Sequence, residues 1–309
     1  MAVLMGDWRR DFRCAEVGEK DIGCELTFMG WVSRVRNMGG ILFVWLRDRS
    51  GVIQLVFDAE HVDEATYRLA ESLRGEYVLA ARGTVIARDP AAVNEKLATG
   101  KIEVQVKEAK LLNESATPPI YTDDGMVENE AVRLKYRYLD LRRPSMQAML
   151  RTRSDTVNAI RNHMVKEGFV EVETPIMTKS TPEGARDFLV PSRLHPGKFY
   201  ALPQSPQIYK QLLMLSGLDR YFQFAKCFRD EDSRADRQPE FTQLDLEMSF
   251  VEPPDVQRVV EGAFAEVFKT VKGLDIRLPL QRMTWKEAMA SYGSDKPDLR
   301  FGMKIHHLN

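Results

Sequence analysis

The first third of the chain alternates between hydrophobic and polar residues in short runs, from Glu25 to about Leu112. A two-residue period is typical of strands with one face in a core and the other in water, and five such runs are present. Between the third and the fourth run, residues 59–75 carry apolar side chains at helical spacing and end on a glycine. Five strands with one helix at this place predict an OB-fold barrel, a module that commonly binds single-stranded nucleic acid.

The segment after the barrel, residues 113–130, is polar and contains prolines, which predicts a linker. Residues 131–150 form a basic segment that we expect to be helical, and residues 151–168 predict a second helix that ends at a glycine. Residues 169–177 alternate like a strand, although Pro175 restricts this strand to a sheet edge or a strand end.

Further along, two strands are predicted at residues 219–230 and 240–250, joined by a highly charged loop. A strand that turns into a helix precedes them, and an amphipathic helix follows at residues 253–273. The fold class is therefore α+β and multidomain. We expect a barrel domain at 1–112, a linker or hinge at 113–134 and an antiparallel-sheet domain at 135–309.

The second strand of this charged hairpin has one apolar and one polar face. Its apolar face comprises Leu244, Leu246, Met248 and Phe250, and its polar face comprises Gln243, Asp245, Glu247 and Ser249. The loop before it carries several arginines, which can grip a phosphate bidentately, beside acidic residues that can select an amine. A salt-bridged surface hairpin would show the same pattern.

Composition narrows the class of protein. The formal net charge is −1 and the pI is near 6.6, so a nucleic-acid partner must be held by local basic patches. The three cysteines form no zinc-binding or disulfide pattern, which favours a reducing cytoplasm, and we expect no metal site in this chain. No apolar run has the length of a membrane span, so no membrane partner is expected.

Four motifs resemble the class II aminoacyl-tRNA synthetases, in the form found in bacterial aspartyl-tRNA synthetases. The charged hairpin "FRDEDSRADRQPEFTQLDLEMSF" resembles motif 2, and "GFVEVETPIM" with its preceding helix resembles motif 1. "STPEGARDFLVPSR" resembles the flipping loop of that family, and "ALPQSPQIYKQLLM" resembles its amino-acid pocket segment. The predicted barrel is similar to the anticodon-binding domain, so the resemblance covers essentially the whole chain.

The resemblance implies a two-step reaction. L-Aspartate and ATP give aspartyl-adenylate, and the adenylate then acylates the 3′ end of tRNA(Asp), with tRNA(Asn) left open as a further partner. Arg229 would be catalytic, since a fixed guanidinium stabilises charge that builds on the α-phosphate. The implied ATP contacts are Arg229, Glu231, Gln238 and Phe241. The implied aspartate contacts are Glu183, Ser205, Gln207, Lys210, Arg229, Gln243 and Asp245.

Within the aspartate set, Lys210 would face the side-chain carboxylate of the substrate, and Asp245 would bind its amino group. Glu183 would close over that amino group when the loop folds down. From the residues alone, Lys210 equally fits a solvated lysine on an amphipathic helix, Glu183 a surface charge, and Phe241 a core residue. The role of Glu247 stays open.

For the barrel, the resemblance implies that Arg36, Phe43 and Gln54 contact the tRNA anticodon. An aromatic ring can stack on a splayed base, an arginine can bind a phosphate or a base edge, and an amide can read an edge. Phe43 in an alternating strand fits a core residue equally well. Met38 is a candidate for discriminating between tRNA(Asp) and tRNA(Asn).

The chain also departs from the family pattern. A motif 3 of the "GLGLDR" type is absent from the sequence, as are the acidic Mg²⁺ ligands expected there. We therefore expect a fragment with little adenylation activity alone, because members of a catalytic unit act non-additively. Motif 1 implies a homodimer. The alternatives are a related ligase for asparagine or lysine and a non-catalytic tRNA-binding OB-fold protein.

Overall fold

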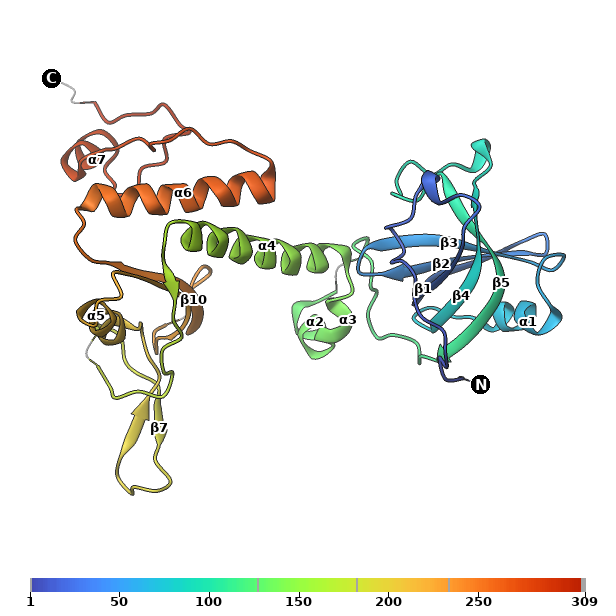
Figure 1. Ribbon diagram of the computed structural model, residues 1–309, viewed down its shortest axis with the longest axis horizontal. Helices are drawn as coiled ribbons and strands as arrows, with labels where there is room; N and C mark the ends of the chain where they lie inside the picture. The colour runs from blue at the N-terminus through green and yellow to red at the C-terminus, as the bar shows by residue number, and fades with distance from the viewer. Residues whose placement is uncertain (1, 127, 182, 233, 307–309) are drawn as a thin grey trace. The chain divides into compact units, whose positions relative to one another are not determined.

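The computed structural model of the chain describes residues 2–126, 128–181, 183–232 and 234–306 (Figure 1). The chain divides into two compact units, Met1–Arg151 and Thr152–Asn309. The division falls within helix α4, Pro144–Lys166. No helix in the described part of the chain combines the length and hydrophobicity that crossing a membrane requires.

The first unit contains the closed five-stranded barrel that the alternation predicted, with the strand order β1-β2-β3-β5-β4. Its strands are β1 (Glu25–Met38), β2 (Ile41–Asp48), β3 (Gly51–Asp58), β4 (Val78–Ala87) and β5 (Ile102–Asn113). Helix α1, Glu64–Ser72, lies between β3 and β4. The predicted OB-fold topology is therefore confirmed.

Alternation in β2 explains which side chains fill the barrel. Leu42, Val44 and Leu46 are buried in the core, whereas Phe43 and Trp45 point to the outer face and stay partly exposed.

The barrel also requires a close backbone approach at Gly83 in β4. A Cβ atom there would lie 2.2 Å from the Gln105 carbonyl oxygen, where the β4–β5 register also shifts.

The basic segment after the barrel is not one continuous helix, contrary to our expectation. It forms α2 (Glu130–Lys135), α3 (Arg137–Asp140) and the start of α4, and it breaks at Tyr136, whose φ of −109° and ψ of 41° are not helical. The break lets several arginines converge on the fully buried carboxylate of Asp140. These arginines are Arg133, Arg137 and Arg143. Their charges therefore stabilise this turn.

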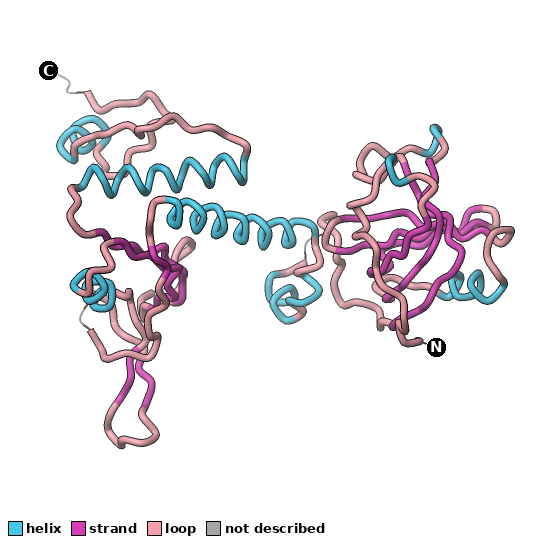
Figure 2. The backbone as a smooth tube through the Cα atoms, viewed as in Figure 1, coloured by secondary structure: helices cyan, strands magenta, loops and turns pink. Residues whose placement is uncertain are grey.

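The second unit is built around a three-stranded sheet with the order β10-β9-β6. Figure 2 shows its strands together with a separate two-stranded ribbon, β7 with β8. The strands are β6 (Val170–Glu171), β7 (Leu189–Pro191), β8 (Phe199–Ala201), β9 (Arg220–Phe228) and β10 (Glu240–Met248). The helices are α4, α5 (Gln207–Leu215), α6 (Pro253–Lys272) and α7 (Trp285–Tyr292).

The antiparallel hairpin β9–β10 confirms the two strands predicted around the charged loop. The strand predicted at residues 169–177 is much shorter, because only Val170 and Glu171 pair, in parallel, with β9. Phe250 is also a correction. It lies beyond the end of β10 with a positive φ of 56° and is 99% exposed, so it does not share the apolar face of that strand.

Helices α4 and α6 lie close together beside the sheet (Figure 1). His163 of α4 approaches α6 so closely that a Cβ atom on Gly262 would lie 2.5 Å from its ring, and its Nε2 lies 2.9 Å from the Val259 carbonyl oxygen. The core between helices and sheet includes Met164, Phe169, Phe222 and Val259, and Leu244, Leu246 and Met248 of β10 pack against it. The apolar face of β10 is thus partly buried against this core, and its polar face, which includes the buried Asp245, is left for the site.

Candidate functional site

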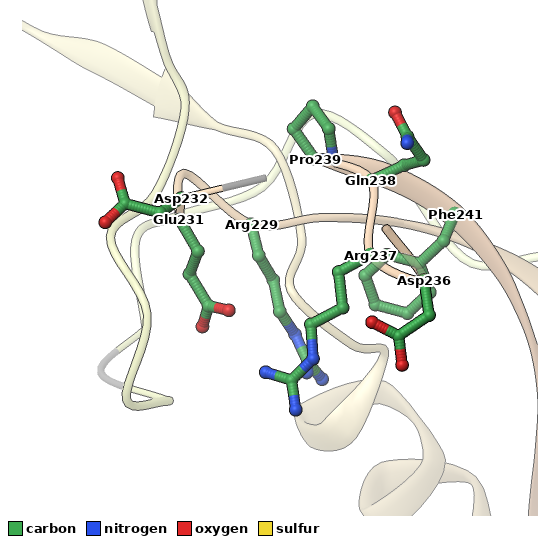
Figure 3. A pocket seen from close by; sticks show the side chains of 8 residues that line it. All are labelled: Arg229, Glu231, Asp232, Asp236, Arg237, Gln238, Pro239 and Phe241. Carbon is green, nitrogen blue, oxygen red and sulfur yellow. The ribbon is translucent and has the colours of Figure 1, made fainter. Parts of the chain in front are cut away.

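The charged loop between β9 and β10 surrounds a cavity of about 380 Å³ (Figure 3). This volume lies within the range of small-molecule sites. Its lining residues are Arg229, Glu231, Asp232, Asp236, Arg237, Gln238, Pro239 and Phe241. The structure therefore brings together all four residues that the resemblance assigned to ATP.

Arg229 directly follows β9, and both its backbone and its side chain contact the other arm of the hairpin. Its backbone N–H donates to the Pro239 carbonyl oxygen at 2.8 Å, which closes the hairpin directly after β9. Its guanidinium carbon lies 5.1 Å from the centroid of the Phe241 ring, a cation–π contact. In Figure 3 the Arg229 and Arg237 side chains extend in the same direction. Two guanidinium groups beside an aromatic face suit a nucleotide phosphate and base.

A second polar group is centred on Lys210 of α5 and Asp245 of β10. The Lys210 ammonium donates to Asp245 Oδ1 at 2.9 Å, and it lies 3.6 Å from Glu247 Oε2. Only 13% of the Lys210 side chain and 7% of the Asp245 side chain are exposed. Lys210 is therefore not a solvated surface lysine, and Glu247, whose role the sequence left open, is its second acidic neighbour.

This pair retains unused hydrogen-bonding capacity. Asp245 Oδ2 is buried and has no hydrogen-bond partner among the residues that the structure describes, and an ammonium has three donors, of which Asp245 takes one. The nearby Tyr221 hydroxyl is also buried, and no described residue offers it a partner within 3.5 Å. Its burial first, and the Asp245 charge second, raise the pKa of Tyr221 well above its usual value, so the phenol stays neutral. A buried acceptor left free in this way is suited to a ligand cation.

The remaining predicted aspartate contacts lie in the loop that carries Glu183, in the segment before α5, and on α5 and β10 themselves. Ser205 Oγ donates to Glu183 Oε2 at 2.7 Å. Gln207 is the first residue of α5, one turn before Lys210 and on the same side of the helix. Gln243 lies two residues before Asp245 on the same face of β10, and its Oε1 is 3.4 Å from Cys227 Sγ.

The charged groups described above all act on the Cys227 thiol, which lies in β9. Burial is the main cause that raises its pKa to about 11, and the negative charge of Asp245 adds to this effect. Arg229, Glu183 and Lys210 act on the same thiol through their charges. Groups from the loop, from α5 and from both strands of the hairpin therefore converge on one region of the second unit.

The barrel carries the predicted nucleic-acid residues on one outer face. Arg36 of β1 pairs in register with Phe43 of β2, and Trp45 pairs in register with Gln54 of β3. Phe43 is not part of the barrel core. The guanidinium carbons of Arg34 and Arg36 lie 5.4 and 5.7 Å from the Trp45 ring centroid. The face therefore offers cations and aromatic rings together, as single-stranded nucleic-acid sites do.

Trp45, which the sequence reasoning missed, also fixes the Gln54 amide. The indole N–H donates to Gln54 Oε1 at 3.0 Å, and Gln54 Nε2 donates to Glu103 at 2.8 Å. The position of Trp45 two residues after Phe43, on the same strand face, was a signal that the alternation already contained. Gln204, which is 1% exposed and contacts the loop near Glu183, was also missed, although it lies within the quoted segment "ALPQSPQIYKQLLM", because that pattern does not show its partners.

In the part of the chain that the structure describes, no group of three or more His, Cys, Asp or Glu residues could hold a metal ion. The described residues therefore supply no ligand cluster for the Mg²⁺ that accompanies ATP in such reactions.

Comparisons with known proteins agree with this geometry. Residues 26–112 match the family "OB-fold nucleic acid binding domain", and residues 129–308 match "tRNA synthetases class II (D, K and N)". The chain is 57% identical to an aspartate--tRNA ligase of Clostridium tetani and 54% identical to an aspartate--tRNA(Asp/Asn) ligase of Caldanaerobacter subterraneus. Both matches extend over all 309 residues of this chain. It spans about half the length of these relatives, 52% in both cases.

Among solved structures, asparaginyl-tRNA synthetase from Pyrococcus horikoshii complexed with asparaginyl-adenylate matches with a TM-score of 0.75 and 27% identity, over 86% of this chain and 59% of that one. A putative aspartyl-tRNA synthetase from Leishmania major, at 23% identity and a TM-score of 0.73, covers 88% of this chain and 55% of its own and shares the fold. The class II match extends over more than half of the chain. The chain therefore belongs to the class II tRNA synthetases of the D, K and N family.

Proposed function

We propose that this protein is an aspartate–tRNA ligase, which activates L-aspartate with ATP and transfers it to the 3′ end of tRNA(Asp). The observation that carries the proposal is the buried Lys210–Asp245 pair, in which the ammonium donates only one of its three protons to Asp245 and Oδ2 has no partner in the described part of the chain. A substrate with a carboxylate at one end and an ammonium at the other satisfies both groups at once. The names of the relatives support the same choice.

In the proposed first step, an oxygen of the aspartate α-carboxylate attacks the α-phosphorus of ATP in line, and pyrophosphate leaves with the electron pair of the broken P–O bond. Arg229 stabilises the charge that builds on the α-phosphate. Phe241 stacks on adenine, and Glu231 and Gln238 contact the nucleotide. In the second step, a terminal ribose hydroxyl of tRNA attacks the aspartyl carbonyl carbon, and AMP leaves.

Selectivity for aspartate follows from the charges of the pocket. Lys210 binds the side-chain carboxylate, Asp245 and Gln243 bind the other polar groups of the amino acid, and Glu183 closes over its amino group with Ser205 and Gln207 beside it. A lysine substrate would place its ammonium against Lys210, and asparagine would exchange a charged hydrogen bond for a neutral one. Hydrogen bonds to charged groups contribute about 1.5–3 kcal/mol and neutral ones about 0.5–1.5 kcal/mol, so the exchange costs about 1–1.5 kcal/mol, and we expect discrimination of roughly 5- to 12-fold against asparagine.

The test is calorimetric binding of the sulfamoyl analogues of aspartyl-, asparaginyl- and lysyl-adenylate to the purified chain, with aspartate-dependent ATP–pyrophosphate exchange in parallel. We expect the aspartyl analogue to bind most tightly, with little exchange because motif 3 is absent from this sequence. Preference for another analogue would overturn the assignment to aspartate. Binding of tRNA without any analogue would favour a non-catalytic tRNA-binding protein.

The proposed role of the barrel is to bind the anticodon of tRNA(Asp) through Arg36, Phe43 and Gln54. Because base–aromatic stacking is worth about 1–3 kcal/mol, Phe43→Ala should weaken tRNA binding about 5- to 150-fold. Phe43 makes no phosphate contact in this proposal, so the salt dependence of binding should not change. Fluorescence anisotropy with a tRNA(Asp) transcript measures both, with Phe12→Ala, an exposed phenylalanine of the same unit, as the control.

We also propose that the protein works as a homodimer in the cytoplasm, with motif 1 at the interface. The exposed apolar side chains of Val165 on α4 and of Ile176 and Met177 after β6 support this. Multi-angle light scattering should give twice the chain mass of 35.4 kDa. A monomer at micromolar concentration would contradict the dimer.

We propose that barrel residues decide whether the protein charges tRNA(Asp) alone or both tRNA(Asp) and tRNA(Asn). Met38 is a candidate, since it is 64% exposed at the end of β1.

A further inference from the structure

Gln204 lies immediately before Ser205, in the segment between β8 and α5, and its side chain is 1% exposed. It faces residues 183–188, the part of the loop that carries Glu183. Neighbouring backbone bonds fix both segments, since Leu202 N–H donates to the Phe188 carbonyl oxygen and Phe228 N–H donates to the Pro203 carbonyl oxygen, both at 2.9 Å. The two residues before Gln204 are therefore anchored by backbone hydrogen bonds.

The Gln204 amide pairs with the loop backbone as a neighbouring strand would. Its Nε2 donates to the Ala185 carbonyl oxygen at 2.9 Å, and its Oε1 accepts from the Ala185 N–H at 3.2 Å. A side-chain amide is suited to this because it carries a donor and an acceptor in one plane. A hydrocarbon side chain of the same size would leave both backbone groups of Ala185 without these partners.

The Gln204 amide also binds a side chain of the loop, that of Asp187. Gln204 Nε2 donates to Asp187 Oδ1 at 2.5 Å, and Asp187 Oδ2 accepts from Ser180 Oγ at 2.5 Å. Ser205, the next residue, donates to Glu183. Two consecutive residues of one segment thus bind the loop on both sides of its turn, Gln204 at Ala185 and Asp187 and Ser205 at Glu183.

We propose that Gln204 is a positioning residue that holds residues 183–187 in their observed place and so sets the position of the Glu183 carboxylate beside the amino-acid pocket. It acts through the Ala185 backbone and through Asp187, and it does not touch the substrate. The consequence for substrate binding rests on the proposed function, whereas the clamp on the loop does not. A residue that only fills space would influence stability but not the placement of Glu183.

Gln204→Glu tests the clamp with almost no change in shape. The carboxylate keeps an acceptor for the Ala185 N–H but loses both donors, and it stands against the Asp187 carboxylate. We expect hydrogen exchange at the Ala185 amide to rise by at least about tenfold, because broken hydrogen bonds near a charge are costly. Affinity for the aspartyl-adenylate analogue should fall by about 10- to 100-fold. Burying the new carboxylate should lower the melting temperature, but binding of ATP alone should change little. Loss of analogue affinity with ATP binding retained is a split that a purely structural role would not produce.

Three further variants make the test specific. Gln211→Glu makes the same chemical change at an exposed position of α5 and should leave exchange and affinity unaltered. Adding Asp187→Asn to Gln204→Glu restores a donor opposite the new carboxylate and should recover part of the protection and of the affinity. Gln204→Leu, which removes the amide without adding charge, should open the loop in the same way.

The outcomes separate the clamp from the function. Unchanged exchange at Ala185 in both Gln204 variants would overturn the clamp. Faster exchange with full affinity for the analogue would overturn the positioning role. If the unaltered chain protects Ala185 but binds no adenylate analogue, the proposed function fails, and faster exchange in Gln204→Glu then still supports the clamp.

Discussion

Replacing Lys210 with methionine is expected to destabilise the β9–β10 hairpin and to abolish selective recognition of aspartate. The reason is that Asp245 would remain as a buried carboxylate without a counter-charge, and Lys210 is its only ion-pair partner among the described residues. Removing one partner of a buried ion pair typically costs about 3–5 kcal/mol. Amide hydrogen exchange in β9 and β10 measures the loss as a lower free energy of opening. Lys226→Met in the exposed pair with Glu240 should cost less than about 1 kcal/mol.

A double-mutant cycle separates the charge from the shape. Asp245→Asn on its own should also destabilise the hairpin, because Lys210 then lacks its partner at 2.9 Å. In the Lys210→Met background, however, the same change removes the uncompensated carboxylate and should restore stability. The coupling expected for a contacting charge pair is about 1–3 kcal/mol. Additive single effects, or a Lys210→Met hairpin as stable as the Lys226→Met control, would contradict the buried pair.

Binding of the aspartyl-adenylate analogue provides the functional measurement for the same variants. Lys210→Met should lower its affinity at least about tenfold through the lost charged hydrogen bond. The double variant should regain stability without regaining affinity, because neither substituted residue can bind the charged ends of aspartate. Stability and recognition therefore depend on the same two residues but respond differently to the second substitution.

Most of the barrel was predictable because period-2 alternation reports directly on which side chains point inward. The second unit was less predictable, since its elements depend on contacts distant in sequence. The run at residues 169–177 alternates, but only Val170 and Glu171 have a partner strand. Residues 131–150 have helical composition, but the buried carboxylate of Asp140 collects three arginines around a break in the helix. Neither partner can be read from local pattern.

For the site, the sequence indicated the charged residues but not their partners. The resemblance assigned Lys210 and Asp245 to one ligand, yet the direct ion pair between them and the unpaired Oδ2 appear only in three dimensions. Gln204 lies within the predicted pocket segment but carries no charge, and its link to Ala185 depends on a close approach of two loops that the local pattern does not show. The individual site assignments remain predictions that the variants above test.

In the first unit, Glu76 is the buried, ion-paired carboxylate whose replacement we expect to destabilise the fold most. It lies just before β4 with a positive φ of 67° and is 6% exposed. Both of its oxygens accept from Arg47 at 2.8 Å, and it also accepts from Arg142 at 2.5 Å and from Thr122 at 2.7 Å. One carboxylate therefore ties the barrel to the segment that follows it, including Arg142, whose guanidinium stacks on Trp31.

Glu76→Gln is expected to lower the free energy of unfolding of this unit by about 3 kcal/mol, because two arginines lose a shared, mostly buried counter-charge while the shape is kept. Three of the four tryptophans, Trp8, Trp31 and Trp45, lie in this unit, so urea unfolding followed by tryptophan fluorescence reports on it. Glu71→Gln, an exposed position in α1, is the matched control and should leave the unfolding midpoint unchanged.

The pH dependence of this difference gives the sharper test. Burial is the largest single influence and opposes ionisation of Glu76, but the Arg47 charge and the hydrogen bonds from Thr122, Arg47 and Arg142 outweigh it, so its pKa lies below the usual value. Its contribution to stability is therefore fully present above the unfolded-state pKa of about 4.3 and is lost as the pH falls through the lower folded-state pKa. The unaltered chain should exceed Glu76→Gln by a constant margin from about pH 5 to 8, and the two should converge in more acidic solution. A margin that persists to the lowest pH at which both fold would show that shape and hydrogen bonding, and not the charge of Glu76, stabilise the junction.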